Sequence, residues 1–311
     1  MVLGMDIGGT YIRSAFVDAK HKLEEFRIDK TAEVLSGDNI PDKLAEYTAN
    51  LLNAKKMSPL AIVMGLPSTV DRDNRFVYST PNIQGLNNID IAACVEKVCT
   101  IPVYVNRDVN LILLYDIYDN NLKNEGFILG FYIGTGFGNA ISLNGRIVVG
   151  KHGVSGELGH IPMLGKKDPC GCGSLGCLEL YASGKRLAEI HDTHFNGMPF
   201  DSIFENNSEH PVVTEFIENI AMGIASEITI LDPDEVILGG GVVVQKSFPR
   251  KKLEAAIRNY TRKPYPADNL HFIYSKESNK NGVIGAGIFG FQKIGLKDTK
   301  KGAAIAAPLP D

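Results

Sequence analysis

The hydrophobic and polar positions along the first part of the chain predict an α/β unit. An apolar run, a turn at a glycine pair and two further apolar stretches indicate three antiparallel strands. Stretches with a helical period then alternate with short buried runs, as in a sheet that continues in parallel strands. The expected elements are strands at Val2–Ile7, Tyr11–Val17 and Leu23–Ile28, a helix at Ile40–Ala54, a strand at Leu60–Leu66, a helix at Ile89–Val98 and a strand at Val103–Val105.

The same pattern begins again near Gly126. Another apolar run, another glycine-rich turn and two more strands precede a long helix with an apolar stripe at every third or fourth residue. The expected elements are strands at Gly126–Ile133, Asn139–Leu143 and Arg146–Val148, a helix at His210–Leu231, a strand at Glu235–Leu238, a helix at Phe248–Arg262, a strand at Leu270–Tyr274 and a helix at Gly282–Ile294.

This repetition predicts two similar α/β domains with a cleft between them. We expect a small N-terminal domain over residues 1–108 and a large C-terminal domain over residues 109–289. A helix near residues 290–297 is expected to pack back on the first domain. Residues 298–311 are rich in Lys, Ala and Pro without a period, which predicts a loosely attached tail.

The composition of the chain indicates which class of protein has this fold. The chain has 311 residues, of which 44% are hydrophobic, and this is enough for two packed cores. A formal net charge of −4 argues against nucleic acid as the main partner. No apolar run approaches the roughly 18 residues of a membrane span, and a strand directly after Met1 leaves no room for a signal peptide. We therefore expect a cytoplasmic enzyme that contacts no membrane.

The segment from His160 to Glu179 carries a set of metal-binding residue types within twenty positions. Three thiolates and one imidazole are the ligands of a closed tetrahedral zinc site, which leaves no position for a catalytic water. The alternatives are three unrelated core cysteines, or one disulfide with a free thiol. Glycines between the cysteines disfavour a core, and a bridge between cysteines two residues apart would be strained. The predicted ligands of a structural zinc ion are His160, Cys170, Cys172 and Cys177.

The other two cysteines, Cys94 and Cys99, lie in an apolar helical stretch and are expected to be inert thiols. Five cysteines with three of them clustered favour a reducing compartment. Two carboxylates, Glu157 and Glu179, flank the predicted zinc loop. Acidic side chains held by a rigid loop are suited to a small molecule rich in hydroxyl groups.

Glycine clusters fall at three strand ends. Glycine lets backbone N–H groups approach an anion, and Thr10 adds a hydroxyl donor to the first cluster. Asp6, at the end of a buried strand, could hold a hydrated Mg²⁺ ion. Each cluster alone could also be an ordinary tight turn; together they predict two phosphate loops and one adenosine loop. The expected contacts to ATP are Asp6, Gly8, Gly9, Thr10, Gly134, Thr135, Gly136, Gly138, Gly239, Gly240 and Gly241.

Asp108 follows a predicted strand and begins a predicted helix. A carboxylate at that position could take a proton from an attacking hydroxyl group, although Asp also caps helices readily. Asn106 and Asn82 could hydrogen-bond a sugar hydroxyl, or could be turn residues. The spacing alone leaves these alternatives open.

Together these motifs resemble the ROK family of bacterial sugar kinases (repressor, open reading frame, kinase), within the superfamily of sugar kinases, Hsp70 and actin. The resemblance covers about residues 2–294. The family's D-x-G-x-T hairpin stands at Asp6–Thr10, its G-E-x-G-H motif at Gly156–His160 and its C-x-C-G-x-x-G-C-x-E motif at Cys170–Glu179. The resemblance implies a two-domain actin-like ATPase fold with a structural zinc loop.

The resemblance also implies an activity and the residues that perform it. The reaction is transfer of the γ-phosphoryl group of MgATP to the 6-hydroxyl group of an aldohexose, by an enzyme that is a homodimer. Asp108 is the implied catalytic base, and His160 is implied to contact both zinc and sugar. The implied sugar contacts are Asn106, Glu157, His160 and Glu179, and the implied zinc ligands are His160, Cys170, Cys172 and Cys177.

This chain departs from the family around the base. The family usually has Asn-Asp-Ala-Asn there, whereas this chain has Asn106-Arg107-Asp108-Val109-Asn110. Arg107 then stands where the sugar-binding Asn is expected, so either Arg107 or Asn106 contacts the sugar; a solvated Arg is the alternative. The loops similar to the D-allose kinase subgroup are Arg107–Leu111, Lys30–Val34, Val63–Pro67, Ser79–Asn82 and Ser155–Pro162.

The expected substrate is therefore D-allose, with glucose, mannose and N-acetylmannosamine as alternatives. Two other function classes are disfavoured. A ROK repressor carries an N-terminal helix-turn-helix region, whereas the phosphate hairpin here begins at residue 6. A sugar-binding protein or chaperone-like ATPase without kinase activity would not need the base, Glu157 and the zinc loop together.

Overall fold

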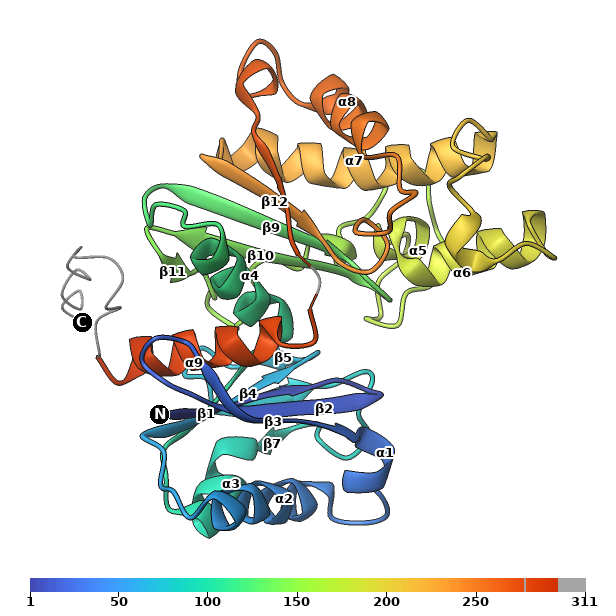
Figure 1. The fold of residues 1–311 in the computed structure, drawn as a ribbon. Helices are drawn as coiled ribbons and strands as arrows, with labels where there is room; N and C mark the ends of the chain where they lie inside the picture. Colours follow the sequence, from blue (N-terminus) through green and yellow to red (C-terminus); the bar gives the residue numbers. More distant parts are fainter. Residues whose placement is uncertain (277, 296–311) are drawn as a thin grey trace. The chain divides into compact units, whose positions relative to one another are not determined.

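The computed structural model describes residues 1–276 and 278–295, which divide into two units. Unit 1 comprises Met1–Asn120, Val149–Val154 and the described part of Ser278–Asp311, and unit 2 comprises Asn121–Val148 and Ser155–Glu277. Figure 1 shows both units. Each has its own sheet, and each sheet has its own buried apolar core.

Unit 1 is built on a five-stranded sheet with the order β3-β2-β1-β4-β8. The first three strands are antiparallel, and β4 and β8 continue parallel to β1. A second sheet of short strands has the order β5-β6-β7. The strands are β1 (Val2–Ile7), β2 (Tyr11–Val17), β3 (Leu23–Lys30), β4 (Ala61–Leu66), β5 (Thr69–Val70), β6 (Phe76–Ser79), β7 (Ile89–Asp90) and β8 (Val103–Arg107).

Helices cover both faces of the main sheet of unit 1 (Figure 1). α2 and α3 pack on one face and bury its apolar residues, whereas α9 packs on the other face beside α4. A side chain at Gly285 of α9 would collide with the backbone oxygen of Leu111 in α4, so glycine is required for this close helix contact. The helices are α1 (Thr31–Val34), α2 (Ile40–Lys55), α3 (Ile91–Cys99), α4 (Asp108–Asp119) and α9 (Asn281–Lys293).

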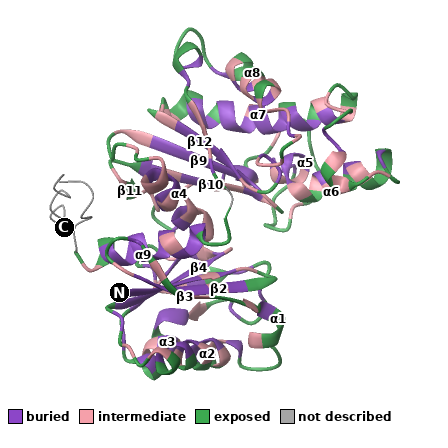
Figure 2. Ribbon diagram, viewed as in Figure 1, coloured by how far each residue is buried: buried purple, intermediate pink, exposed green. Residues whose placement is uncertain are grey.

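Unit 2 repeats the strand plan of unit 1, with the order β11-β10-β9-β12-β13. β9, β10 and β11 are antiparallel, and β12 and β13 run parallel to β9. Its long helix α7 is buried along one side, as Figure 2 shows. The elements are β9 (Phe127–Ile133), β10 (Phe137–Leu143), β11 (Arg146–Ile147), α5 (Glu179–Ala182), α6 (Gly184–His194), α7 (Pro211–Leu231), β12 (Glu235–Gly239), α8 (Arg250–Tyr260) and β13 (Phe272–Tyr274).

The predicted repetition of one α/β plan is confirmed by the two strand orders. The division of the chain differs from the expected boundary after residue 108, because α4 packs with α9 and belongs to unit 1. The C-terminal helix α9 spans Asn281–Lys293, within a residue of the helix expected at Gly282–Ile294, and it packs on β1 and β4 of unit 1. The predicted tail at 298–311 lies outside the described residues. Within the described ranges, no helix has both the length and the apolar character to cross a membrane.

Unit 2 buries one carboxyl group inside its long helix face, that of Glu227 in α7. Glu227 of α7 is 8% exposed, and its Oε2 has no hydrogen-bond partner among the described residues. The neighbouring strand β10 contributes Asn139, which is fully buried and whose Oδ1 is likewise unpartnered within the described chain. Burial raises the pKa of Glu227 to about 7, and the Asn139 amide opposes that shift. The carboxyl group is therefore held in its protonated form more firmly in the folded chain than in the unfolded chain.

Stability should consequently fall as pH rises from about 4.5, the ordinary pKa of Glu, to about 7, the folded pKa of Glu227. We expect Glu227→Gln to raise the free energy of unfolding by up to about 3 kcal/mol at pH 8 and by little at pH 4.5. Urea unfolding at both pH values measures this difference. Glu218→Gln, an exposed position on the same helix, is the control and should not change with pH. Parallel pH profiles for wild type and Glu227→Gln would contradict the assignment.

Candidate active site

The first glycine turn joins β1 to β2, and two hydrogen bonds at Gly8 fix its conformation. The Gly8 amide donates to the Tyr11 carbonyl at 2.9 Å, and the Thr31 hydroxyl donates to the Gly8 carbonyl at 2.7 Å. Gly9 and Thr10 remain exposed at the tip. The turn around Asn82 packs against Gly9, where an added Cβ would lie 3.2 Å from the Asn82 backbone oxygen. The structure thus brings Asn82, which is exposed, beside the turn expected to bind phosphate.

Asp6, at the end of β1, is a partly buried carboxylate with two charged neighbours. Its Oδ2 accepts a hydrogen bond of 3.4 Å from Arg13 of β2. Burial raises the pKa of Asp6 to about 6, the charge of Asp108 adds to this, and Arg13 opposes it. Gly282, at the start of α9, lies so close that an added Cβ would be 2.9 Å from the Asp6 carboxyl carbon. The environment of Asp6 therefore comes from β1, β2, α4 and α9.

Asp108 is the first residue of α4 and directly follows β8. The helix cap position is Arg107, whose side chain makes no capping hydrogen bond, so the interpretation of Asp108 as a helix cap is wrong. The Asp108 Oδ1 accepts from the adjacent Val109 amide at 2.8 Å. Burial raises the pKa of Asp108, and the Val109 amide and the Arg107 charge oppose the shift. A carboxylate whose pKa is raised binds a proton more readily than an ordinary Asp, as a general base requires.

The two residues before Asp108 are both buried. Arg107 is 6% exposed, so the alternative of a solvated surface charge is wrong. Asn106 is 1% exposed, and its Oδ1 accepts from the Arg107 amide and from Asn110 Nδ2, both at 2.9 Å. These bonds tie the end of β8 to the first turn of α4. The Asn106 Nδ2 has no partner among the described residues and is the free end of that side chain.

The second glycine turn joins β9 to β10 and is fixed by the start of α6. The Gly134 carbonyl accepts from the Gly184 amide at 2.7 Å, and the Thr135 carbonyl accepts from the Lys185 amide at 3.2 Å. Gly138, which was expected in this turn, is instead the second residue of β10. The turn is shorter than expected because the β9–β10 ladder continues to its end, where Phe137 pairs with Ile133.

Glu179 lies against this second turn. Its Oε2 accepts from the Phe137 amide at 2.8 Å, and a side chain at Gly136 would collide with the same oxygen. Glu179 is an expected sugar contact, but one of its carboxylate oxygens already accepts a hydrogen bond at the end of the turn that is expected to bind phosphate.

The third glycine cluster follows β12 and lies at the same sheet edge, because Gly239 pairs in register with Tyr132 near the end of β9. An added Cβ at Gly239 would lie 2.9 Å from the Tyr132 ring. Gly240 has φ 86°, and an added Cβ there would meet the backbone of Ile133. These two glycines are thus required by packing against β9, and exposed Gly241 follows them.

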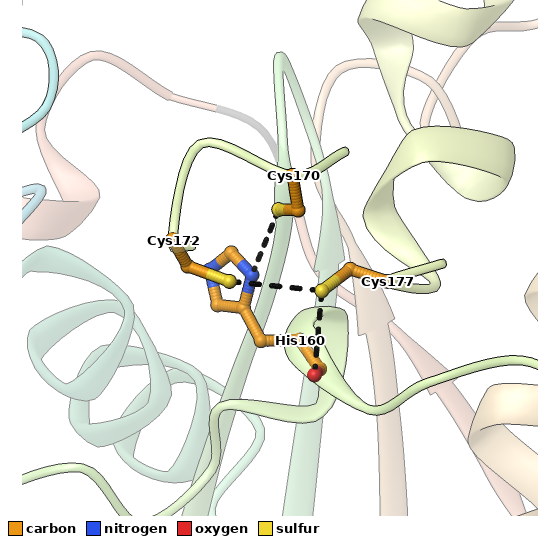
Figure 3. Close-up of side chains that lie close together, drawn as sticks. All are labelled: His160, Cys170, Cys172 and Cys177. Carbon is orange, nitrogen blue, oxygen red and sulfur yellow. Dashed lines mark hydrogen bonds between the residues drawn. The ribbon is translucent and has the colours of Figure 1, made fainter. Parts of the chain in front are cut away.

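The four predicted zinc ligands converge, as Figure 3 shows. Their ligand atoms all lie within 4.8 Å of one another. The His160 Nδ1 is 3.7 Å from Cys170 Sγ, and Cys172 Sγ is 3.6 Å from Cys177 Sγ. All five cysteines are free thiols, so the disulfide alternative is wrong. Three sulfur atoms and one imidazole nitrogen at this spacing are compatible with a structural zinc ion.

Backbone bonds preform the zinc loop, which we define as His160–Cys177. The Cys170 amide donates to the Ser174 carbonyl at 2.9 Å, and the Gly176 amide donates to the Asp168 carbonyl at 2.8 Å. Cys94 and Cys99 lie outside the cluster on α3, and burial raises the pKa of both thiols. This agrees with the inert role expected for those two residues.

The His160 ring links the zinc cluster to the first of the flanking carboxylates. Its Nδ1 faces Cys170, whereas its Nε2 is 3.8 Å from Glu157 Oε2. Both side chains keep about one third of their surface exposed. A ligand hydroxyl group could therefore meet Glu157 and the Nε2 of His160 together.

Unit 1 thus brings together Asp6, the first glycine turn, Asn82, Arg107 and Asp108, and unit 2 brings together the other two turns, Glu157, His160 and Glu179. Sequence reasoning missed Arg13 and Thr31. A cross-strand signal was present for Arg13, because the hairpin register places it directly opposite Asp6. For Thr31 no local signal exists, because its bond to Gly8 spans 23 residues.

Comparison with known proteins gives one family. The sequence profile of the ROK family matches residues 2–292. The N-acetyl-D-glucosamine kinase of Aliivibrio salmonicida is 30% identical over 92% of this chain and 98% of its own length. The glucokinase of Halalkalibacterium halodurans is 27% identical over 92% of this chain and 93% of its own length. The crystal structure of a ROK hexokinase from Thermus thermophilus matches with a TM-score of 0.77 at 26% identity, over 94% of this chain and 99% of that one.

Proposed function

Since the chain belongs to the ROK family, we propose that it is an ATP-dependent carbohydrate kinase that phosphorylates the 6-hydroxyl group of an aldohexose. The observation that carries the proposal is Asp108, a buried carboxyl group with a raised pKa at the start of α4. It shares its electrostatic environment with Asp6 beside an exposed glycine turn. Phosphoryl transfer from ATP to an alcohol uses a carboxylate that orients the hydroxyl group and accepts its proton, together with donors that hold the phosphates.

Each set of residues has a role in this proposal. The 6-hydroxyl oxygen forms a bond to the γ-phosphorus, the bond from that phosphorus to the bridging oxygen of ADP breaks, and the hydroxyl proton goes to Asp108. The backbone amides of Gly9 and Thr10 in the first turn, and of Thr135 and Gly136 in the second, hold phosphate oxygens, because the Gly8 and Gly134 amides already donate within their own turns. Gly239–Gly241 borders the adenosine. Asp6 would hold Mg²⁺ through water, and the ion would neutralise phosphate charge. Glu157, His160, Glu179 and Asn106 bind sugar hydroxyl groups.

Zinc has a structural role in the same proposal. The cluster of His160 and three cysteines would hold the ion, with no open coordination position for a water or a substrate. Its effect on the sugar is indirect: it fixes the ring of His160, whose other nitrogen lies beside Glu157.

For the substrate, we propose D-allose. Arg107 is buried directly before the base, at the position where the family usually has Asn, and a buried guanidinium group can select among hydroxyl configurations through its fixed donors. The names of the relatives favour glucose and N-acetylglucosamine as the second candidates. We further propose that the enzyme is a homodimer and acts in the cytoplasm; sedimentation of the purified protein tests the dimer.

We expect kcat/KM for D-allose to exceed that for D-glucose, which differs only in configuration at C3, by roughly 5- to 150-fold. A misplaced hydroxyl in a closed polar site strands a buried donor or acceptor at a cost of about 1–3 kcal/mol. A coupled ADP-release assay with allose, glucose, mannose, N-acetylglucosamine and N-acetylmannosamine measures the difference. Absence of turnover with every aldohexose would contradict the kinase proposal, whereas equal values for allose and glucose would contradict the allose proposal alone.

Arg107→Asn tests the residue behind that preference. If Arg107 selects the sugar, the ratio of kcat/KM for allose to kcat/KM for glucose should fall toward one in this variant. Its melting temperature shows whether the variant is folded. Arg72→Asn, an exposed position in the same unit, is the control and should leave the ratio unchanged. If the folded Arg107→Asn variant keeps the wild-type ratio of kcat/KM values, another residue determines the preference for allose.

A further inference from the structure

A cavity of about 440 Å³ lies within unit 2, away from the residues assigned to catalysis. Its walls come from α5, α6, α7 and the part of the zinc loop around Lys166 and Asp168. Figure 1 shows the three helices side by side at the end of unit 2. The volume lies within the range of roughly 300–1,000 Å³ that small-molecule sites occupy. None of the residues that line it has a role in the proposed reaction.

Asn219 is the polar group on the wall formed by α7. It is 6% exposed, and its side-chain amide forms no hydrogen bond with any residue in the described part of the chain. It shares one helix face with Val212, Glu215 and Phe216, which also line the cavity. The polar atoms of this amide are not sealed from solvent, so they face the open space of the cavity. The cavity therefore presents an amide NH2 group and an amide oxygen that a ligand or water can bond.

The rest of the deep wall is apolar. Ile190 of α6 is 2% exposed, Phe216 of α7 is 1% exposed and Tyr181 of α5 is 9% exposed. The Tyr181 hydroxyl donates to Asp168 of the zinc loop, which fixes the side chain. Apolar and aromatic walls with a few fixed polar groups suit the C–H faces and hydroxyl groups of a sugar or polyol.

Charged side chains around the opening pair with one another. Lys166 Nζ lies 3.6 Å from Glu215 Oε1, and Arg186 Nη1 lies 3.0 Å from Glu189 Oε2. With Asp168, the lining therefore carries two cations and three carboxylates. Because both cations already have anionic partners and carboxylates are in excess, the cavity is not suited to a phosphate or another anion.

We propose that this cavity is a second ligand site, distinct from the catalytic site, for a neutral polyhydroxylated molecule of the size of a monosaccharide. The Asn219 amide hydrogen-bonds a hydroxyl group, the ligand's C–H face lies on the apolar wall, and the paired carboxylates accept further hydroxyl groups. The proposal does not depend on which sugar the enzyme phosphorylates.

The site has a short physical connection to the catalytic residues. Tyr181 faces the cavity, and Glu179, two residues earlier on the single turn α5, bonds the Phe137 amide. At 3.6 residues per turn, positions two apart point about 200° from each other. α5 therefore separates the cavity from the glycine turn, and a ligand that moves α5 would act on Glu179.

The test uses the full chain with methyl-labelled isoleucine and leucine, titrated with D-glucose in the absence of ATP. We expect the Ile190 methyl signal to shift in wild type and also in Glu157→Gln, which weakens the catalytic site. Asn219→Leu should weaken the Ile190 response by roughly tenfold, as the loss of one buried hydrogen bond predicts, while kcat and KM stay within about twofold of wild type. Asn206→Leu, an exposed position on unit 2, is the control and should bind as wild type.

Two results would overturn the proposal. One is an Ile190 signal that does not move in wild type at glucose concentrations well beyond saturation of the catalytic site, a measurement that needs no variant to fold. The other is inorganic phosphate producing the Asn219-dependent shift in place of glucose, because the site would then bind anions. If no aldohexose is phosphorylated but Ile190 still responds to glucose, the kinase proposal fails and the second site stands.

Discussion

We expect Asp108→Asn to lower kcat by roughly 10²–10⁴-fold, the usual loss when a general base is removed. The KM for the sugar changes far less, because Asn keeps the size of the side chain and can still bond the Val109 amide as Asp108 does at 2.8 Å. A steady-state assay with saturating ATP measures both constants. Asp42→Asn is the matched control, since Asp42 is an exposed carboxylate in the first turn of α2, and it should keep full activity.

The pH dependence separates a base from a structural carboxylate. Burial raises the pKa of Asp108, so kcat should fall with decreasing pH at values above the ordinary range of Asp. Burial raises the pKa of Asp6 to about 6, so Asp6 should contribute to the same decrease of kcat at low pH. This decrease of kcat should be weaker in Asp108→Asn than in wild type. Retention of more than about a tenth of the wild-type kcat would be incompatible with the role of Asp108 as base.

If the cluster holds zinc as proposed, we expect removal of the ion to destabilise unit 2 by several kcal/mol. Structural zinc in small domains is worth about 10–16 kcal/mol of apparent binding free energy, and Cys172→Ser removes one of the three thiolates of the cluster. The melting temperature should drop, and Glu157 should lose its fixed position beside His160, so the KM for the sugar should rise. Calorimetry and elemental analysis, with one zinc expected per chain, measure these effects.

Cys94→Ser is the control for the zinc prediction, because Cys94 is a half-buried thiol on α3 outside the cluster. It should leave the zinc content unchanged. Protein purified without chelator and found to hold no zinc would remove the metal from the proposal. The cluster would then be four side chains held together by the loop alone.

Elements with enough apolar residues could be predicted from the sequence. β4 has no charged residue, β1 has Asp6 as its one charged residue, and the apolar stripe along α7 repeats over 21 residues. Each of these elements therefore appeared within a residue or two of its expected place. β5 has two residues and β6 has four, which is too short for alternation to be detected. α6 buries only Leu187 and Ile190 as apolar residues, so its helical period was too weak to find.

The sequence was enough to identify many residues of the candidate site, but not the contacts that these residues make. The zinc ligands were identifiable because cysteine and histidine at that spacing have few other uses. The bond between Glu179 and the Phe137 amide spans 42 residues and depends on how α5 packs, so no local pattern indicates it. The burial of Arg107 was likewise not predictable, because an Arg is mostly exposed in folded proteins and its burial here depends on tertiary packing that no local pattern shows.

The position of α9 determines the order in which the chain can fold during synthesis. Unit 2 draws nearly all its residues from one stretch that ends at Glu277, so its core is complete as soon as that stretch has left the ribosome. Unit 1 is begun first and finished last, because Gly290 of α9 packs on Val2 of β1 and Gly285 packs on α4. Until residue 293 is made, the sheet that carries Asp6, and whose strand β8 leads into Asp108, lacks the helix α9 that packs on one of its faces. A nascent or truncated chain without α9 would thus have a folded zinc loop but an unfinished catalytic unit.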